Sequence, residues 1–135
     1  MPDLIALRYP ALHRARQAWR CGDDQSALAK LEGDGAARLR LAPDDRVTIV
    51  EADPRLEALY GRPLRGAAAD LLSPDADIAV EATIAADTGC ELFVEDTVTL
   101  TGGATRMARL YLPLAPALTE ADVLCLVVVS AASKT

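Results

Sequence analysis

Hydrophobic and polar residues recur with two different periods along this chain. Near the N-terminus, Leu12, Ala15 and Trp19 recur at helical spacing and form one apolar stripe. A second short helix is expected over residues 24–32. From residue 37 onward, apolar and charged residues alternate one by one, which indicates a half-buried strand. The sequence therefore predicts N-terminal helices followed by a sheet.

Two strands and a short helix come next. Residues 37–41 and 46–52 are the strands, and the Pro-Asp-Asp sequence between them is typical of a turn, so we expect a hairpin. Asp53 can cap a helix with its carboxylate, and Pro54 suits the first helical position. A short helix is therefore predicted over residues 54–60.

A longer helix and three more strands complete the pattern. Ser73-Pro74-Asp75 repeats the cap signal and opens a predicted helix of about 15 residues. A Gly-Gly pair at 102–103 then predicts a tight hairpin turn. The last strand is apolar on both faces over residues 123–129, so we expect it to be central in the sheet and covered on both sides. The three strands are expected over residues 91–100, 104–114 and 121–131.

This order of elements predicts the α+β class, with a five-stranded antiparallel sheet and helices between its second and third strands. We divide the chain into an N-terminal helical segment for capping or dimerisation (residues 1–35), a domain (36–131) and a tail (132–135). Hydrophobic residues make up 51% of the chain and charged residues 25%, a balance that fits one globular domain.

Charge and cysteine content exclude several functions. The net charge is −6, and no basic face is visible, so we expect no nucleic-acid partner. The longest apolar run, at 123–129, is far shorter than the roughly 20 residues that span a bilayer. Three scattered cysteines without a Cys-x-x-Cys pair suggest neither a metal site nor disulfides. No secretory signal is evident, and we expect a cytoplasmic location.

The stretch VTIVEADPRLEALYGRPLRG, residues 47–66, resembles the corresponding part of PAS domains. That family tends to have a strand ending in Asn or Asp, a short helix, an aromatic residue or Leu with Gly, and a second Gly. Asp53, Tyr60-Gly61 and Gly66 occupy those positions. The resemblance covers residues 36–131, and the Arg- and Trp-bearing N-terminal helix is similar to that of PAS-like proteins of alphaproteobacteria.

The resemblance implies a sensory or regulatory module, and the residues argue against two familiar cofactors. Haem-binding relatives use a histidine on the long crossing helix, whereas His13, the only histidine, lies outside the domain core. Photoactive flavin-binding relatives need a cysteine in a short helix after the second strand, where this chain has none. We therefore expect no cofactor, no catalytic residue and no metal, and not an enzyme.

A PAS cavity between the sheet and its helices is the candidate ligand site. An apolar pocket with one hydroxyl would suit a small hydrophobic ligand. The alternative is that the same side chains simply fill the core. The expected lining residues are Ile49, Tyr60, Leu71, Ile84, Leu110, Leu112 and Val127.

The opposite face of the sheet is the candidate interface. On the strand 104–114 we expect the Leu series to point inward and Met107, Arg109 and Tyr111 to point outward. The N-terminal helix or a second copy of the chain would cover this outer face. The candidate interface residues are Leu12, Ala15, Trp19, Met107 and Tyr111.

Three functions remain open. The first is a PAS-like regulatory module in bacterial signal transduction that homodimerises and contacts a signalling protein or output domain. The second is a small-molecule sensor domain of a histidine kinase or cyclase. The third is a small α+β isomerase-like enzyme with an Asp/Tyr site, which would need an acidic side chain beside Tyr60 or Tyr111 on the inner face. The inner face is expected to be apolar, so the third ranks lowest.

Overall fold

The computed structural model of the 135-residue chain describes six stretches. The predicted helix over 24–32, the turn at 43–45, the cap at Ser73-Pro74-Asp75 and Cys21 lie outside the described residues. The described residues are 8–20, 35–41, 46–72, 77–100, 103–113 and 121–131.

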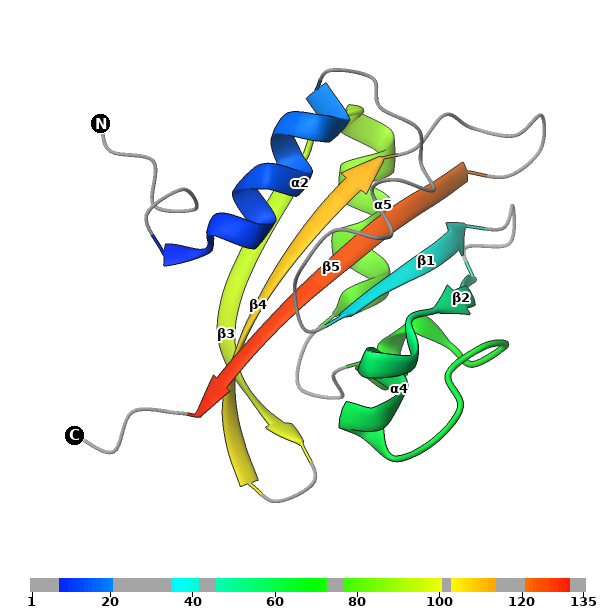
Figure 1. Ribbon diagram of the computed structural model, residues 1–135. Coiled ribbons are helices and arrows are strands. Elements are labelled where there is room, and N and C mark those ends of the chain that lie inside the picture. The colour runs from blue at the N-terminus through cyan, green and yellow to red at the C-terminus, as the bar shows by residue number, and fades with distance from the viewer. Residues whose placement is uncertain are drawn as a thin grey trace.

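Five strands form one antiparallel sheet in the order β2-β1-β5-β4-β3 (Figure 1). The first hairpin joins the last three strands through β1, which pairs with β5. β5 therefore lies at the centre of the sheet, as the sequence predicts. The strands are β1 (Gly35–Leu41), β2 (Val47–Ala52), β3 (Leu92–Leu100), β4 (Gly103–Pro113) and β5 (Ala121–Ala131).

The short helix α4 (Pro54–Tyr60) begins and ends where its sequence signals indicate. The Asp53 carboxylate accepts a hydrogen bond from the backbone N–H of Arg55 at 2.8 Å, and Pro54 occupies the first turn. Gly61 ends the helix at φ 66°, a left-handed conformation that glycine adopts without steric cost. A single 3₁₀ turn, η1 (Ala69–Leu72), follows it.

The crossing helix α5 (Ile78–Thr88) is shorter at its start than the sequence suggests. Asp77 has φ −91° and ψ 74° and makes no side-chain cap hydrogen bond, so the helix begins at Ile78 and spans 11 residues. Gly89 ends it at φ 66°, with its N–H bonded to the Ala85 carbonyl. This start places Glu81 in the first turn of α5, from which its side chain reaches β4 of the sheet.

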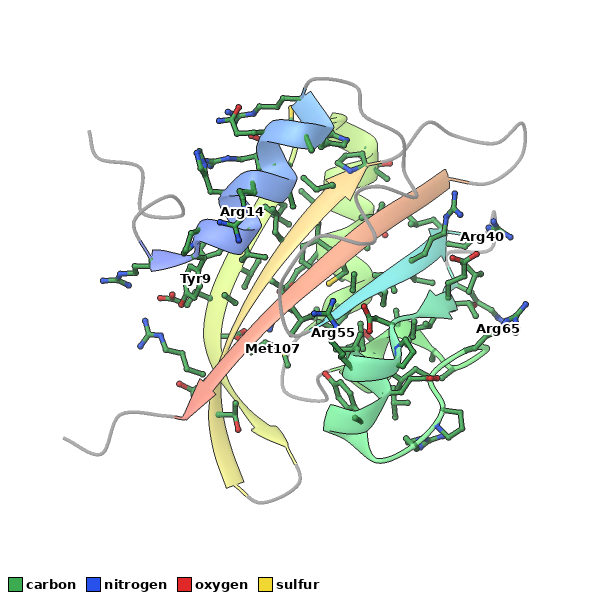
Figure 2. The ribbon with its side chains drawn as sticks, in the orientation of Figure 1. Tyr9, Arg14, Arg40, Arg55, Arg65 and Met107 are labelled. Atoms are coloured by element: carbon green, nitrogen blue, oxygen red, sulfur yellow. The ribbon has the colours of Figure 1, made fainter. Side chains whose placement is uncertain are left out.

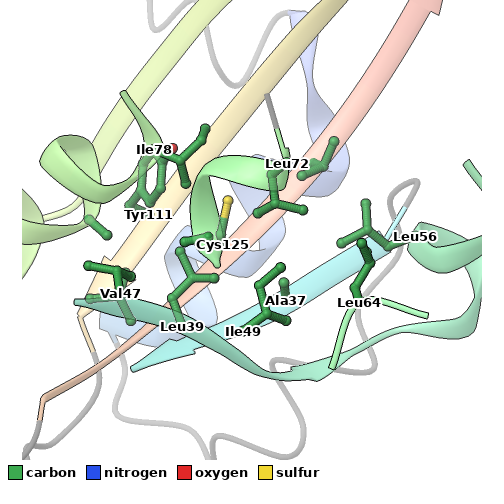
Figure 3. Packing of buried hydrophobic residues seen from close by; sticks show 14 of the residues in the cluster. Ala37, Leu39, Val47, Ile49, Leu56, Leu64, Leu72, Ile78, Tyr111 and Cys125 are labelled. Carbon is green, nitrogen blue, oxygen red and sulfur yellow. The ribbon is translucent and has the colours of Figure 1, made fainter. Parts of the chain in front are cut away.

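Helices cover the sheet on both sides (Figure 1). On the inner side, α4, η1 and α5 pack on the sheet in one large apolar cluster, part of which Figure 3 shows. On the outer side, α2 (Pro10–Arg20) packs on β4 and buries Leu12 and Ala15. The N-terminal extension therefore covers the sheet of its own chain.

The two faces of β4 are the reverse of the expected ones. Met107 and Tyr111 belong to the inner cluster, whereas Leu110 and Leu112 are buried beneath α2. The reason is complementarity: the narrow apolar stripe of α2 lies on the Leu series. The inner face instead accommodates a polar group, because α5 carries a carboxylate toward it.

Loss of the Asp53 cap should destabilise the domain. Asp53→Ala removes the acceptor for the Arg55 N–H and should lower the free energy of unfolding by about 0.5–2 kcal/mol in urea titrations. Asp53→Asn keeps a capping oxygen and should cost less. Hydrogen bonds from Arg55 lower the pKa of Asp53, so its stabilisation is present near neutral pH and is lost as the pH falls through that lowered pKa. Equal losses in both variants would contradict the capping role.

Candidate functional site

A buried guanidinium lies on the inner face of the sheet. Arg109, in the middle of β4, has no exposed surface. Glu81 of α5 and Asp96 of β3 flank it from two sides. Three consecutive elements, α5, β3 and β4, therefore meet at one cation.

Each of the two carboxylates accepts two hydrogen bonds from this guanidinium, a bidentate arrangement. Arg109 Nε donates to Glu81 Oε1 at 3.1 Å and Nη2 donates to Glu81 Oε2 at 3.2 Å. Its Nη1 and Nη2 also donate to Asp96 Oδ1 at 2.8 Å and to Oδ2 at 2.9 Å. Such paired charge-assisted hydrogen bonds fix the orientation of the side chains as well as their distance.

The pattern of alternation in the strands explains why these groups meet. Odd-numbered residues of β4 from Met107 to Tyr111 point inward, and so does Asp96 of β3, whose register partner is Met107. Asp96 is thus the diagonal neighbour of Arg109, a distance that long side chains bridge. We call Arg109, Glu81, Asp96 and Tyr111 the inner ion cluster.

Tyr111 completes the cluster from the same strand as Arg109. Its hydroxyl donates a hydrogen bond to Glu81 Oε1. Burial, the neighbouring Cys125 and the bond to Glu81 raise the pKa of Tyr111. Burial likewise raises the pKa of the Cys125 thiol to about 12, so both groups stay protonated at neutral pH.

Arg109 stays charged despite its burial. Burial alone would lower its pKa, but the hydrogen bonds that Arg109 donates to Asp96 and Glu81 outweigh that effect and raise the pKa. One guanidinium faces two carboxylates, of which Asp96 is the more exposed, at 36% of its side chain against 16% for Glu81. Water can therefore solvate the Asp96 side of the cluster.

The residues predicted to line a pocket separate into three groups. Ile49 and Val127 are buried in the inner cluster of apolar side chains, and Tyr60 and Leu71 pack partly buried against it. Leu110 and Leu112 lie on the other face, beneath α2. Ile84 is 46% exposed on α5. The pocket itself stays a prediction, and the structure does not bring these seven residues together.

The predicted interface residues also divide between the faces. Leu12 and Ala15 are buried between α2 and the sheet, with Trp19 half-buried beside them. Met107 and Tyr111 are buried on the inner face, where they pack with the inner apolar cluster. Their role as contacts to a second copy stays a prediction.

Sequence reasoning missed Arg109, Glu81 and Asp96 because it assigned β4 the wrong faces. One signal was present: alternation along β4 places Arg109 on the same side of the strand as Met107 and Tyr111. The Glu81–Tyr111 pair also supplies the acidic neighbour that the isomerase alternative requires. Both oxygens of Glu81 already accept hydrogen bonds from Arg109, however, so the arrangement is that of a structural anchor.

Other chemistry is sparse in the described part of the chain. Residues in these ranges form no group of three His, Cys, Asp or Glu side chains that could hold a metal ion. None of the helices described here is long and apolar enough to cross a membrane. Cys90, just after α5, is exposed and Cys125 is buried in β5.

Removal of the buried cation should be strongly destabilising. Arg109→Met leaves the largely buried Glu81 carboxylate without its cation and should cost about 3–5 kcal/mol of unfolding free energy in chemical denaturation. The double variant Arg109→Met/Glu81→Leu removes the inner carboxylate as well and should recover most of that loss. If the double variant were no more stable than Arg109→Met alone, the ion cluster would not be the cause.

The sequence matches no protein-family model and no curated protein. Among solved structures, a domain of an HTR-like protein from Haloarcula marismortui aligns with a TM-score of 0.54 and 18% identity, over 70% of this chain and 96% of that one. A fungal LOV domain photoreceptor aligns with a TM-score of 0.59 and 20% identity, over 93% of this chain and 92% of that one.

These likenesses concern the fold. Because one neighbour is a photoreceptor, the comparison lends no support to the expectation that photoactive flavin is disfavoured, and that expectation stays a prediction. The strand order, the helices between β2 and β3 and the crossing helix agree with the expected architecture. The chain has the PAS fold.

Proposed function

We propose that this domain is a sensory or regulatory signalling module that acts by protein contact, with a second copy of itself as the first partner. The fold supports a sensory role, because one structural neighbour is a photoreceptor with the same architecture. The distribution of buried and half-buried side chains supports contact at the surface as the means of action.

The inner face favours contact over ligand capture. In the part of the chain that the structure describes, sixteen buried residues pack between the sheet and its inner helices, and the buried Arg109 guanidinium lies on the same side of the sheet. An apolar ligand would have to displace packed side chains and lie beside a buried cation whose partners must stay in place. A ligand-sensing role for a kinase or cyclase remains the weaker alternative.

The observation that carries the proposal is the placement of the aromatic residues. The chain has one tryptophan, three tyrosines and one phenylalanine. Tyr9, Trp19 and Phe93, three of these five, gather half-buried around α2 on the outer side. The rings of Tyr9 and Phe93 lie 5.7 Å apart, centre to centre. We call these three the aromatic rim. Half-exposed aromatic side chains are the residues that protein interfaces favour.

Polar contacts hold α2 in the position that displays this rim. At its end, Arg20 pairs with Glu91, and the Trp19 indole N–H donates to the Pro113 carbonyl at 2.6 Å. At its start, Tyr9 donates to Glu95, and Figure 2 shows Tyr9 beside β3. The helix is therefore oriented at both ends, so a second copy would meet a defined surface.

A substitution in the aromatic rim tests the proposed dimer. In light scattering from micromolar to millimolar concentration, we expect the full chain to associate reversibly into dimers. Trp19→Ala removes a rim residue and should weaken the dimer about tenfold, the loss typical of a contact that costs more than 1 kcal/mol when truncated.

Tyr60→Phe is the matched control. It changes an aromatic residue on the inner side, where the Tyr60 hydroxyl donates to the Leu72 carbonyl, and should leave the dimer constant unchanged. A chain that stays monomeric throughout the concentration range, with or without Trp19, would refute the proposed contact.

A further inference from the structure

We propose that the edge strand β3 couples the inner ion cluster to the docking of α2, so that release of Asp96 from Arg109 loosens the helix on the other side of the sheet. This inference rests on the proposed function and names the regulation of its contact surface. It requires that one structural element touch both sites and be able to move.

Two consecutive residues of β3 contact the two sites. Successive side chains of a strand point to opposite faces. Asp96 points inward and holds Arg109, whereas Glu95 points outward, where Tyr9 donates to it and Arg8 pairs with it at 3.4 Å. A rotation of the backbone at this dipeptide therefore moves both contacts at once.

The outward side of the first half of β3, together with Glu91 just before it, contacts α2 and the residues at its start. Glu91, just before the strand, pairs with Arg20 at the end of the helix. Phe93 packs against the Tyr9 ring, and Glu95 binds the Tyr9 hydroxyl at the start of the helix. The hydrogen bonds from Tyr9 and Arg106 lower the pKa of Glu95, which keeps it charged. The position of β3 thus sets the position of α2.

β3 can shift once Asp96 releases Arg109. Within the described residues it is an edge strand whose ladder partner is β4, so a change in its twist breaks no second described ladder. Its inward contact with Arg109 comes from Asp96, the more exposed carboxylate of the cluster. Glu81, the other carboxylate, belongs to α5 and contacts no residue of α2 among the bonds described.

This arrangement gives a sharp contrast between two variants. Asp96→Asn weakens the contact of the cluster with β3, whereas Glu81→Gln weakens its contact with α5. Both remove one negative charge that faces the same guanidinium. Only Asp96→Asn should therefore loosen the packing of α2 on the sheet.

The test is hydrogen exchange of the full chain at a concentration where it is monomeric. We expect Asp96→Asn to raise the exchange of α2 amides, relative to β5 amides, about twofold or more, the size of effect typical of residues that couple two sites. Acrylamide quenching of Trp19, the single tryptophan, should rise with it. Glu81→Gln and the exposed-site control Asp87→Asn should leave both α2 readouts unchanged.

A double-mutant cycle completes the experiment. Glu95→Gln should loosen α2 directly, and Asp96→Asn should then add less than it does alone, since the link is already broken. If Asp96→Asn does not fold, Arg109→Lys can be used in its place. This variant replaces the paired hydrogen bonds of the guanidinium by those of a single ammonium group and should give the same response in α2.

Three results would overturn the coupling: no change in α2 with Asp96→Asn, an equal change with Glu81→Gln, or full additivity with Glu95→Gln. The proposed function can fail separately, because these readouts are taken on the monomer. Coupling without a dimer would refute the dimer alone, and a dimer without coupling would refute this inference alone.

Discussion

A charged guanidinium with no exposed surface is the constraint on which this structure depends. A cation removed from water is tolerable only when it is paired and hydrogen-bonded, and Arg109 has four such bonds to two carboxylates. Because Glu81 belongs to α5 and Asp96 to β3, the requirement fixes a helix and an edge strand relative to β4. Apolar packing alone allows small shifts, whereas two-pronged ion pairs do not. The cluster therefore defines the geometry of the inner face.

The outer face depends on that geometry through β3. The strand carries Glu95 and Phe93 toward α2 and Asp96 toward the interior, so one backbone segment serves both layers. The helix α2 rests on the Leu series of β4, and the polar contacts at its two ends set its direction. A filled interior and an ordered outer helix together suit a module that signals through its surface.

Most of the architecture could be predicted from local signals. Asp53-Pro54 and Gly61 define α4 through the cap and the left-handed turn, which are properties of a few adjacent residues. The central place of β5 follows from its apolar character on both faces. The faces of β4 could not be predicted, because alternation tells which residues lie together and not which side is inner. That choice depends on Glu81, whose position is set by where α5 crosses the sheet. The ion cluster was missed for this reason.

The central claim, that Arg109 is held on both sides by the interior of the domain, can be tested directly by nitrogen-15 NMR of the arginine side chains. A guanidinium gripped by two carboxylates should show slow rotation about its Nε–Cζ bond, separate signals for its Nη protons and slow exchange of its Nε proton with water. The signal assigned to Arg109 by its loss in Arg109→Lys should show all three. Fast rotation and fast exchange at Arg109, as expected of a fully hydrated guanidinium, would contradict the account.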